Sequence, residues 1–303
     1  MTVPDCSGAG RFVVVALFAL ASWCASAGDK LLVYTVNYPL QYFAERIAGE
    51  HAEVRFPAPA DVDPALWKPD AETVSQYRKA DLVLLNGAGY ARWAEGLSLP
   101  RHRLVNTSAS FADAYLPMDA SFARGHGSGG DQSHSGTAFT TWLDFYQATQ
   151  QAEAIIQALA RERPQQQAEF ERNYAALKQE LMALDLGLQR LVAAYPDKPL
   201  FVAHPVYQYF ARRYELQLQS VNWEPDVMPS EQEWEQLAYA QEAFPALWML
   251  WGEAPDAAIG ARLQSMGVGV VVFQPCANRP PQGDFLDVMQ RNLDNLKTVF
   301  GES

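Results

Sequence analysis

One long helical stretch near the middle of the chain constrains the fold more than any other feature. A first helical pattern runs from Trp142 to about Arg163, Pro164 interrupts it, and a second pattern continues from about Gln165 to Leu191. At about 1.5 Å of rise per residue, the second helix is roughly 40 Å long. A helix of that length can serve as a backbone that connects two lobes.

The stretches on either side of this helix both alternate strand-like and helix-like patterns. The apolar run that follows Asp81 is typical of a parallel strand covered on both faces. Strands that alternate with helices indicate an α/β lobe with a mostly parallel sheet. The expected strands are 30–36, 52–56, 82–85, 199–204, 218–221, 247–251 and 268–273.

These patterns predict an α/β protein with two lobes, each with a mostly parallel sheet flanked by helices, joined by one long backbone helix. The remaining expected helices end near Gly49, begin near Asp70, or span 206–214, 230–242, 255–266 and 284–300. The predicted parts are a signal peptide (1–27), an N-terminal α/β lobe (28–145), a helical segment with the linker helix (146–194) and a C-terminal α/β lobe (195–303).

The N-terminus has the order of a cleaved secretory signal. Arg11 precedes the apolar run 12–23, and the small residues 25–27 follow. The run is about a dozen residues long, whereas a membrane-spanning helix needs about twenty. A lipoprotein would need a small residue before Cys24, and a tryptophan stands there. We therefore expect a soluble periplasmic protein, cleaved after Ala27.

The net charge limits the classes of binding partner, and the cysteine content limits the possible disulfides. The net charge of -12 and the pI near 4.9 argue against nucleic acid and anionic membranes, since both are bound through basic patches. An acidic surface suits a cationic solute and also keeps many soluble proteins dispersed. Of the 3 cysteines, only Cys276 would remain after cleavage, so the mature chain could form no internal disulfide.

Four short segments, in this order and spacing, resemble the periplasmic zinc/manganese-binding protein family of metal ABC transporters. They are 63–69 (DPALWKP), 138–145 (AFTTWLDF), 201–210 (FVAHPVYQYF) and 271–275 (VVFQP). The resemblance covers nearly the whole mature chain. It implies a two-lobed solute-binding protein that takes a divalent metal ion such as zinc between its lobes and delivers it to an ABC-transporter membrane permease.

The resemblance also places the four metal ligands of the family on this chain. Ala65 and Thr140 stand where the family has histidines, and the neutral Gln274 stands where it has an aspartate. His204 is the one family ligand that carries over, although a histidine at a strand end can also be structural. A zinc site needs about four ligands in tetrahedral array, so the resemblance implies an altered or weakened site.

Other side chains are candidate replacements for the missing ligands. They are His126 and His134 in the Gly/Ser-rich loop 125–135, Glu224, and Cys276. The loop lies where zinc-specific family members carry a His-rich insert. Each candidate also has a structural interpretation: the loop histidines as solvated residues, Glu224 as part of a turn, and Cys276 as a small buried apolar residue.

Aromatic residues near the expected interlobe cleft suggest a second class of ligand. They are Trp67, Trp142, Tyr207 and Trp223. An aromatic-lined cleft with a few polar groups suits a small organic molecule, although Trp142 belongs to the family scaffold and can simply pack. The alternative function is therefore a family member that binds a non-metal small molecule or a protein partner in this cleft.

No catalytic motif supports an enzyme. The segment 87–89 (GAG) lacks the third glycine of a dinucleotide-binding loop, and the chain has neither a nucleophile elbow nor a paired-histidine zinc-protease motif. We expect a monomeric binding protein without catalytic activity.

Overall fold

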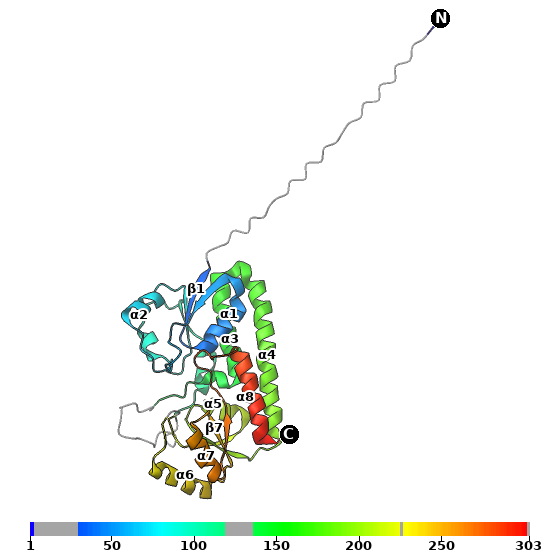
Figure 1. The fold of residues 1–303 in the computed structure, drawn as a ribbon. Helices are drawn as coiled ribbons and strands as arrows, with labels where there is room; N and C mark the ends of the chain where they lie inside the picture. Colours follow the sequence, from blue (N-terminus) through cyan, green and yellow to red (C-terminus); the bar gives the residue numbers. More distant parts are fainter. Residues whose placement is uncertain (3–29, 119–135, 225–226, 302–303) are drawn as a thin grey trace.

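Two four-stranded parallel sheets lie at opposite ends of a long helix, α4 (Gln167–Ala193) (Figure 1). The computed structural model describes residues 1–2, 30–118, 136–224 and 227–301. The two-lobed α/β fold class expected from the sequence is confirmed. Within the described residues, none of the helices combines the length and apolarity needed to cross a membrane.

The N-terminal sheet has the strand order β2-β1-β3-β4, with every neighbouring pair parallel. Its register pairs Val33 with both Val54 and Leu82. The elements of this lobe are β1 (Leu31–Thr35), α1 (Tyr38–Ala48), β2 (Ala52–Arg55), α2 (Ala71–Tyr77), β3 (Leu82–Leu85) and β4 (Leu104–Asn106).

The C-terminal sheet repeats this connectivity with the order β6-β5-β7-β8, again all parallel. Side chains of β7 alternate between its two faces: Leu250 packs into the core shared by both lobes, while Met249 and Trp251 pack into a second cluster on the other face. The elements are β5 (Pro199–Val202), α5 (Gln208–Tyr214), β6 (Gln217–Ser220), α6 (Glu231–Ala243), β7 (Trp248–Trp251), α7 (Ala257–Ser265) and β8 (Gly269–Val272).

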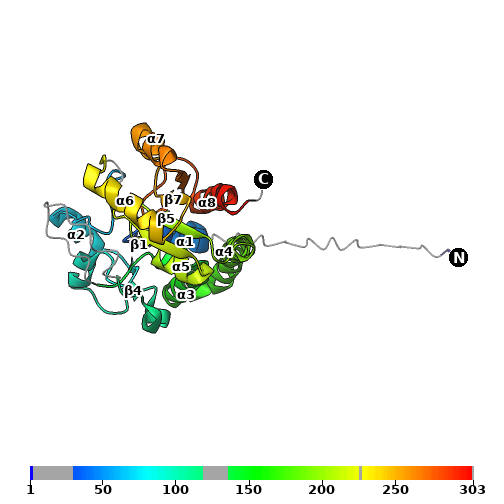
Figure 2. The ribbon, with the colours of Figure 1, turned by 90° about the horizontal axis from the view of Figure 1, so that it is seen from below.

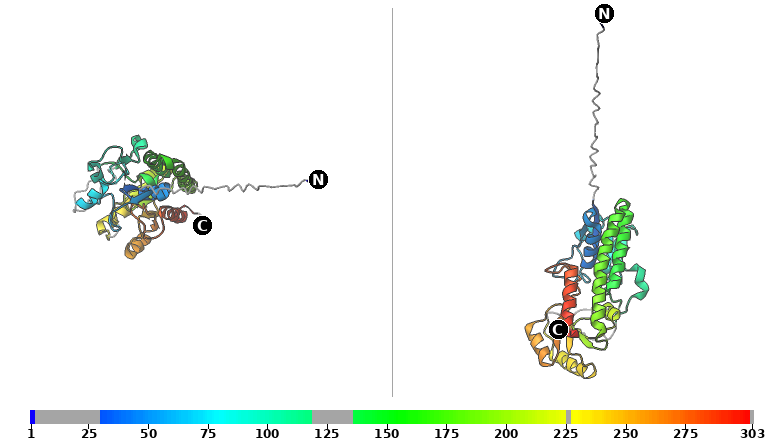
Figure 3. Two further views of the ribbon diagram at one scale, coloured as in Figure 1. Left: turned by 90° about the horizontal axis from the view of Figure 1, so that it is seen from above. Right: turned by 90° about the vertical axis from the view of Figure 1, so that its right-hand side faces the viewer.

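The long helix α4 connects the lobes, as the sequence predicts, and two further helices pack along it. Helices α3 (Phe145–Glu162) and α4 pack along each other, with Pro164 in the short turn between them, and α8 (Phe285–Phe300) runs beside α4 (Figure 3). In Figure 2, these three helices lie on one side of the molecule and α2 and α6 on the other. The ring of Phe285 packs edge-on against Phe43 of α1, so the C-terminal helix reaches the N-terminal lobe.

All seven expected strands are present, and the structure adds an eighth, β4. This strand has three residues, of which Leu104 and Val105 are only partly buried. A run that short shows no periodicity, so the sequence pattern did not reveal it. It forms by pairing with β3, which is a tertiary contact.

The turn after β3 depends on a glycine. Gly87 has a φ of 77°, a left-handed conformation that disfavours side chains. A Cβ atom there would lie 2.0 Å from Ser108 Oγ and 2.3 Å from Asn106 Oδ1. Ser108 is buried and donates a hydrogen bond of 2.6 Å to the carbonyl of Asn86, so it has little room to move.

We expect Gly87→Ala to lower the free energy of unfolding by at least about 2 kcal/mol, because backbone strain and steric overlap add. The control is Gly260→Ala in α7, where nothing lies within 4 Å of the added Cβ. That change should be neutral or stabilise the fold by about 0.5–1 kcal/mol. Urea unfolding monitored by circular dichroism measures both. Equal stabilities of the two variants would contradict the steric argument.

Candidate functional site

Each of the four positions that correspond to family ligands lies in a turn or at the end of an element. His204 and Gln274 each lie two residues beyond the carboxyl end of a strand, β5 and β8 respectively. Thr140 directly precedes a short 3-10 helix, η4 (Thr141–Leu143). Ala65 lies in a turn closed by Asp63, whose Oδ1 accepts a hydrogen bond of 2.8 Å from the Ala65 amide.

Direct hydrogen bonds join the lobes at these positions. Thr140 Oγ1 donates to the carbonyl of Val206 at 2.5 Å, two residues after His204. Trp142 Nε1 donates to the carbonyl of Pro275, next to Gln274, at 2.7 Å. The structure therefore brings the segments that contain Thr140, His204 and Gln274 together at one interlobe junction.

Ala65 comes from the N-terminal side of this junction. It is partly buried and packs against the core that both lobes share. The loop before it contacts the C-terminal lobe, because Asn278 Nδ2 donates to the carbonyls of Pro59 and Val62 at 2.6 and 2.9 Å. A methyl group at position 65 contributes no donor atom for a metal.

The Thr140 hydroxyl forms a hydrogen bond between the two lobes. Its residue is 3% exposed, and its proton points to Val206 O, so it faces protein rather than a solute. Gln274 is held by its backbone: its amide donates to Asn292 Oδ1 at 2.9 Å, and its carbonyl accepts from Asn292 Nδ2 at 2.8 Å. His204 is partly buried, and its backbone carbonyl accepts a hydrogen bond from the amide of Val206.

Of the other candidate ligands, Glu224 and Cys276 are described by the structure, and neither belongs to a metal-binding cluster with His204. Glu224 is exposed. Cys276 is buried with a left-handed φ of 59°, and burial raises the pKa of its thiol to about 12. A thiol with that pKa stays protonated at neutral pH in the metal-free protein. His126 and His134 lie outside the described residues. Among the described residues, no three His, Cys, Asp or Glu side chains gather where they could hold a metal ion.

Three of the four candidate cleft aromatics are enclosed in protein. Trp142, Tyr207 and Trp223 are each 2% exposed or less. Tyr207 donates its hydroxyl proton to the carbonyl of Phe273 at 2.8 Å, and the Trp223 ring lies 4.6 Å from that of Trp234. Trp67 is partly buried and packs edge-on against Trp93. Their roles in ligand contact stay predictions.

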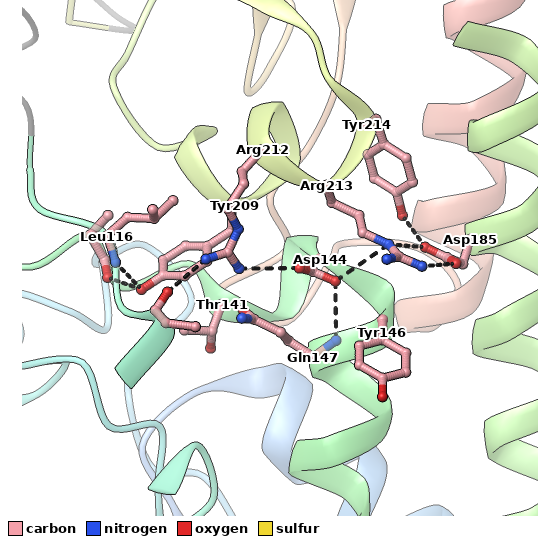
Figure 4. A network of polar contacts seen from close by, with 12 residues as sticks. Leu116, Thr141, Asp144, Tyr146, Gln147, Asp185, Tyr209, Arg212, Arg213 and Tyr214 are labelled. Carbon is pink, nitrogen blue, oxygen red and sulfur yellow. Dashed lines mark hydrogen bonds and ion pairs between the residues drawn. The ribbon is translucent and has the colours of Figure 1, made fainter. Parts of the chain in front are cut away.

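A buried network of charges fixes the C-terminal lobe against the connecting helices (Figure 4). Arg213 of α5 donates two hydrogen bonds to Asp185 of α4, at 2.9 and 2.6 Å, and Tyr214 adds a third at 3.0 Å. Arg213 also lies 3.8 Å from Asp144, which caps the N-terminus of α3, and Arg212 contacts the same carboxylate at 3.3 Å.

The surroundings shift the pKa values of Asp144 and Arg213 in this network. Burial raises the pKa of Asp144 above its usual range, although the amide of Gln147 and the two arginines oppose this. The hydrogen bonds that Arg213 donates to Asp185 raise the pKa of the Arg213 guanidinium, which therefore stays charged. One arginine thus connects three helices, α3, α4 and α5.

Our sequence reasoning missed this network, although a signal for it existed. Asp185 lies between Leu184 and Leu188 on the apolar stripe of α4, where a lone acid needs a buried partner. The adjacent Arg212 and Arg213 offer that partner, but only the fold places them beside α4.

The fold and the junction define a two-lobed solute-binding protein. The family model described as "Zinc-uptake complex component A periplasmic" matches residues 33–299, and the chain belongs to this family. The match covers the strands and helices of both lobes.

Individual relatives are distant. The high-affinity zinc uptake system protein ZnuA of Bacillus subtilis is 25% identical over 309 residues, which cover 95% of this chain and 96% of that protein. The zinc-binding lipoprotein AdcA of Streptococcus pneumoniae is 24% identical over 297 residues, but the chain spans only 59% of its length. The Zn(II)-bound ZnuA-like domain of that AdcA has a similar fold, with a TM-score of 0.77 at 20% identity, covering 90% of this chain and 100% of the domain.

We expect Asp185→Asn to lower the free energy of unfolding by about 2–3 kcal/mol, because it leaves the Arg213 guanidinium without its main charge partner. The control is Glu180→Gln on the same helix, which removes an ion pair with Arg46 whose side chains are 32% and 45% exposed. That change should cost less than about 1 kcal/mol. Thermal and urea unfolding measure both, and an equally small effect at Asp185 would contradict the role given to the network.

Proposed function

We propose that this chain is the periplasmic substrate-binding component of a zinc/manganese-type ABC transport system, with an altered and weakened metal site. The metal ion would be its cargo, and a membrane permease its partner. Its family supports the transport role, and the printed names of its relatives include zinc-binding and zinc-uptake proteins.

One observation carries the proposal of an altered site: Thr140, at a family ligand position, donates its only proton across the junction to Val206. The neighbouring ligand positions offer a methyl group at Ala65 and a neutral amide at Gln274. This supports a junction that closes through protein contacts rather than around an ion.

The expected affinity for zinc follows from the number of ligands. Intact four-ligand sites have apparent binding free energies of about 10–16 kcal/mol. His204 alone would supply roughly a quarter, about 3–4 kcal/mol, which corresponds to a dissociation constant in the millimolar range or weaker. Tighter binding would require further ligands, and the candidates are His126, His134, Glu224 and Cys276.

Export supports the same function. The N-terminal pattern of Arg11, an apolar run and the small residues 25–27 favours secretion with cleavage after Ala27. We propose that the mature protein acts as a monomer in the periplasm and performs no catalysis of its own.

A second function has its own support. The hydroxyl of Tyr90 and the indole N–H of Trp93 are buried and have no hydrogen-bond partner among the described residues. The Tyr90 ring packs edge-on against Phe139 and Trp142, and Trp93 packs against Trp67. Unsatisfied buried donors are costly. Both atoms are covered by protein, so a ligand or partner would reach them only if the surrounding side chains moved, and its acceptor group would then offset that cost.

The protein should bind zinc no tighter than about 1 mM if His204 is the only remaining ligand. Isothermal titration calorimetry of the mature chain with zinc, manganese and copper measures this directly. A deletion of 125–135 separates the roles of His126 and His134 from that of the junction. Submicromolar zinc affinity that survives the deletion would refute the proposal of a weakened site.

Replacing three side chains should restore a metal site, because the elements that hold the ligands in the family are still present. The triple variant Ala65→His, Thr140→His and Gln274→Asp adds two imidazoles and a carboxylate to His204, a set suited to zinc. Thr140→His also removes the bond to Val206, so zinc must replace that link between the lobes. Zinc at 1,000 times its dissociation constant should then raise the free energy of unfolding by about 4 kcal/mol.

The control is the same variant with His204→Ala, which should lose most of the gain. A folded triple variant that binds zinc no better than the parent would show that these positions do not converge.

A further inference from the structure

An apolar cavity lies beside the interlobe junction, and neither the metal proposal nor the charge network uses it. Its volume is about 270 Å³, and it opens partly to solvent. Its walls come from both sides of the junction: the segment that leaves the N-terminal lobe, and β5, α5 and β6 of the C-terminal lobe. The lining residues are Leu116, Pro117, Val202, Tyr207, Gln208, Ala211, Leu216 and Leu218.

The wall from the N-terminal side is held in place. Leu116 and Ala138 are joined by a backbone hydrogen bond of 2.8 Å, and Met118 and Gly136 by another of 2.7 Å. The Tyr209 hydroxyl binds both of these chain segments. It accepts a hydrogen bond from the Leu116 amide at 3.2 Å (Figure 4) and donates one to the Ala138 carbonyl at 2.9 Å. A wall fixed in this way needs little ordering when a ligand enters, which favours binding.

The two polar side chains in the lining direct their polar atoms into the protein. Tyr207 donates its hydroxyl proton to Phe273 O, so its polar end is occupied. Gln208 donates from Nε2 to the Pro205 carbonyl at 2.9 Å and to Met118 Sδ at 3.2 Å. Its Oε1 has no hydrogen-bond partner among the described residues, but it is covered by protein and so does not face the cavity. A ligand would therefore meet mainly carbon atoms of these side chains.

We propose that this cavity is a binding site for a small, uncharged apolar molecule, of the size of one or two fused hydrocarbon rings. An apolar cavity of about 150 Å³ is known to hold benzene, so the larger volume here accommodates a bicyclic ring. A ligand with a polar N–H or O–H group would have to bury that group without a partner, which weakens its binding. The site is independent of the metal proposal because none of its lining residues is a metal ligand.

The experiment compares indene with indole, which have nearly the same shape but differ in one N–H group. Calorimetric titrations of the mature chain are run with a chelator present, so that metal binding plays no part. We expect one saturable site for indene with a dissociation constant below about 1 mM. Indole should bind several-fold more weakly, because its N–H would lose water without gaining an acceptor.

Variants locate the site. Ala211→Phe fills the cavity from α5 and should abolish indene binding, and Ala211→Leu should weaken it by a smaller factor in case the larger ring disturbs folding. The control is Ala257→Phe, the same change at an exposed position of α7, which should bind indene like the parent. Circular dichroism confirms that each variant is folded.

Three results would each overturn the proposal. They are the absence of saturable indene binding, indole binding as tightly as indene, or indene binding that both folded Ala211 variants retain at full strength. None of them depends on zinc, so the outcome for this site is separate from the outcome for the metal site.

Discussion

The side chain of Arg213 is the contact on which the relation between the lobes depends. It pairs with Asp185 in the middle of the long helix and with Asp144 at the start of α3, and it extends from α5 of the C-terminal lobe. The Asp185 carboxylate is buried, so a displaced Arg213 would leave that charge without a partner and without solvent. The network therefore restrains α5 of the C-terminal lobe relative to α4 and the start of α3.

Backbone carbonyls of one lobe come within reach of side chains of the other. Trp142 and Thr140 donate to Pro275 and Val206, and these bonds occupy the region to which family resemblance assigns a metal ion. The Thr140 hydroxyl joins the two lobes through a direct hydrogen bond to Val206. The family resemblance implies a histidine at this position, which would join the lobes through a metal ion. The altered metal site that we propose is thus compatible with an intact two-lobed fold, because the hydrogen bonds between the lobes do not require a metal ion.

Much of this was predictable from the chain itself, and the failures have identifiable causes. Apolar periodicity located seven strands and the long helix to within a few residues. It missed β4, whose three residues are too few to show a period. The pattern of α8 predicts a helix but not its neighbour, and only packing places Phe285 against Phe43. The four family positions are a prediction from resemblance, and resemblance did not predict the hydrogen bond that Thr140 donates to Val206.

The sequence by itself determined the local elements, the two-lobed α/β class and the identity of the side chains at 65, 140, 204 and 274, because propensity, periodicity and motif spacing are properties of short segments. Tertiary structure alone decided which of those side chains are free to meet a solute. Burial and partners depend on residues far apart in the chain: Asp185 is 28 residues from Arg213, and Thr140 is 66 from Val206. The sequence alone does not show whether the Thr140 hydroxyl is available to a solute. In the folded protein it is already hydrogen-bonded to the Val206 carbonyl, because folding brings that acceptor within hydrogen-bonding distance.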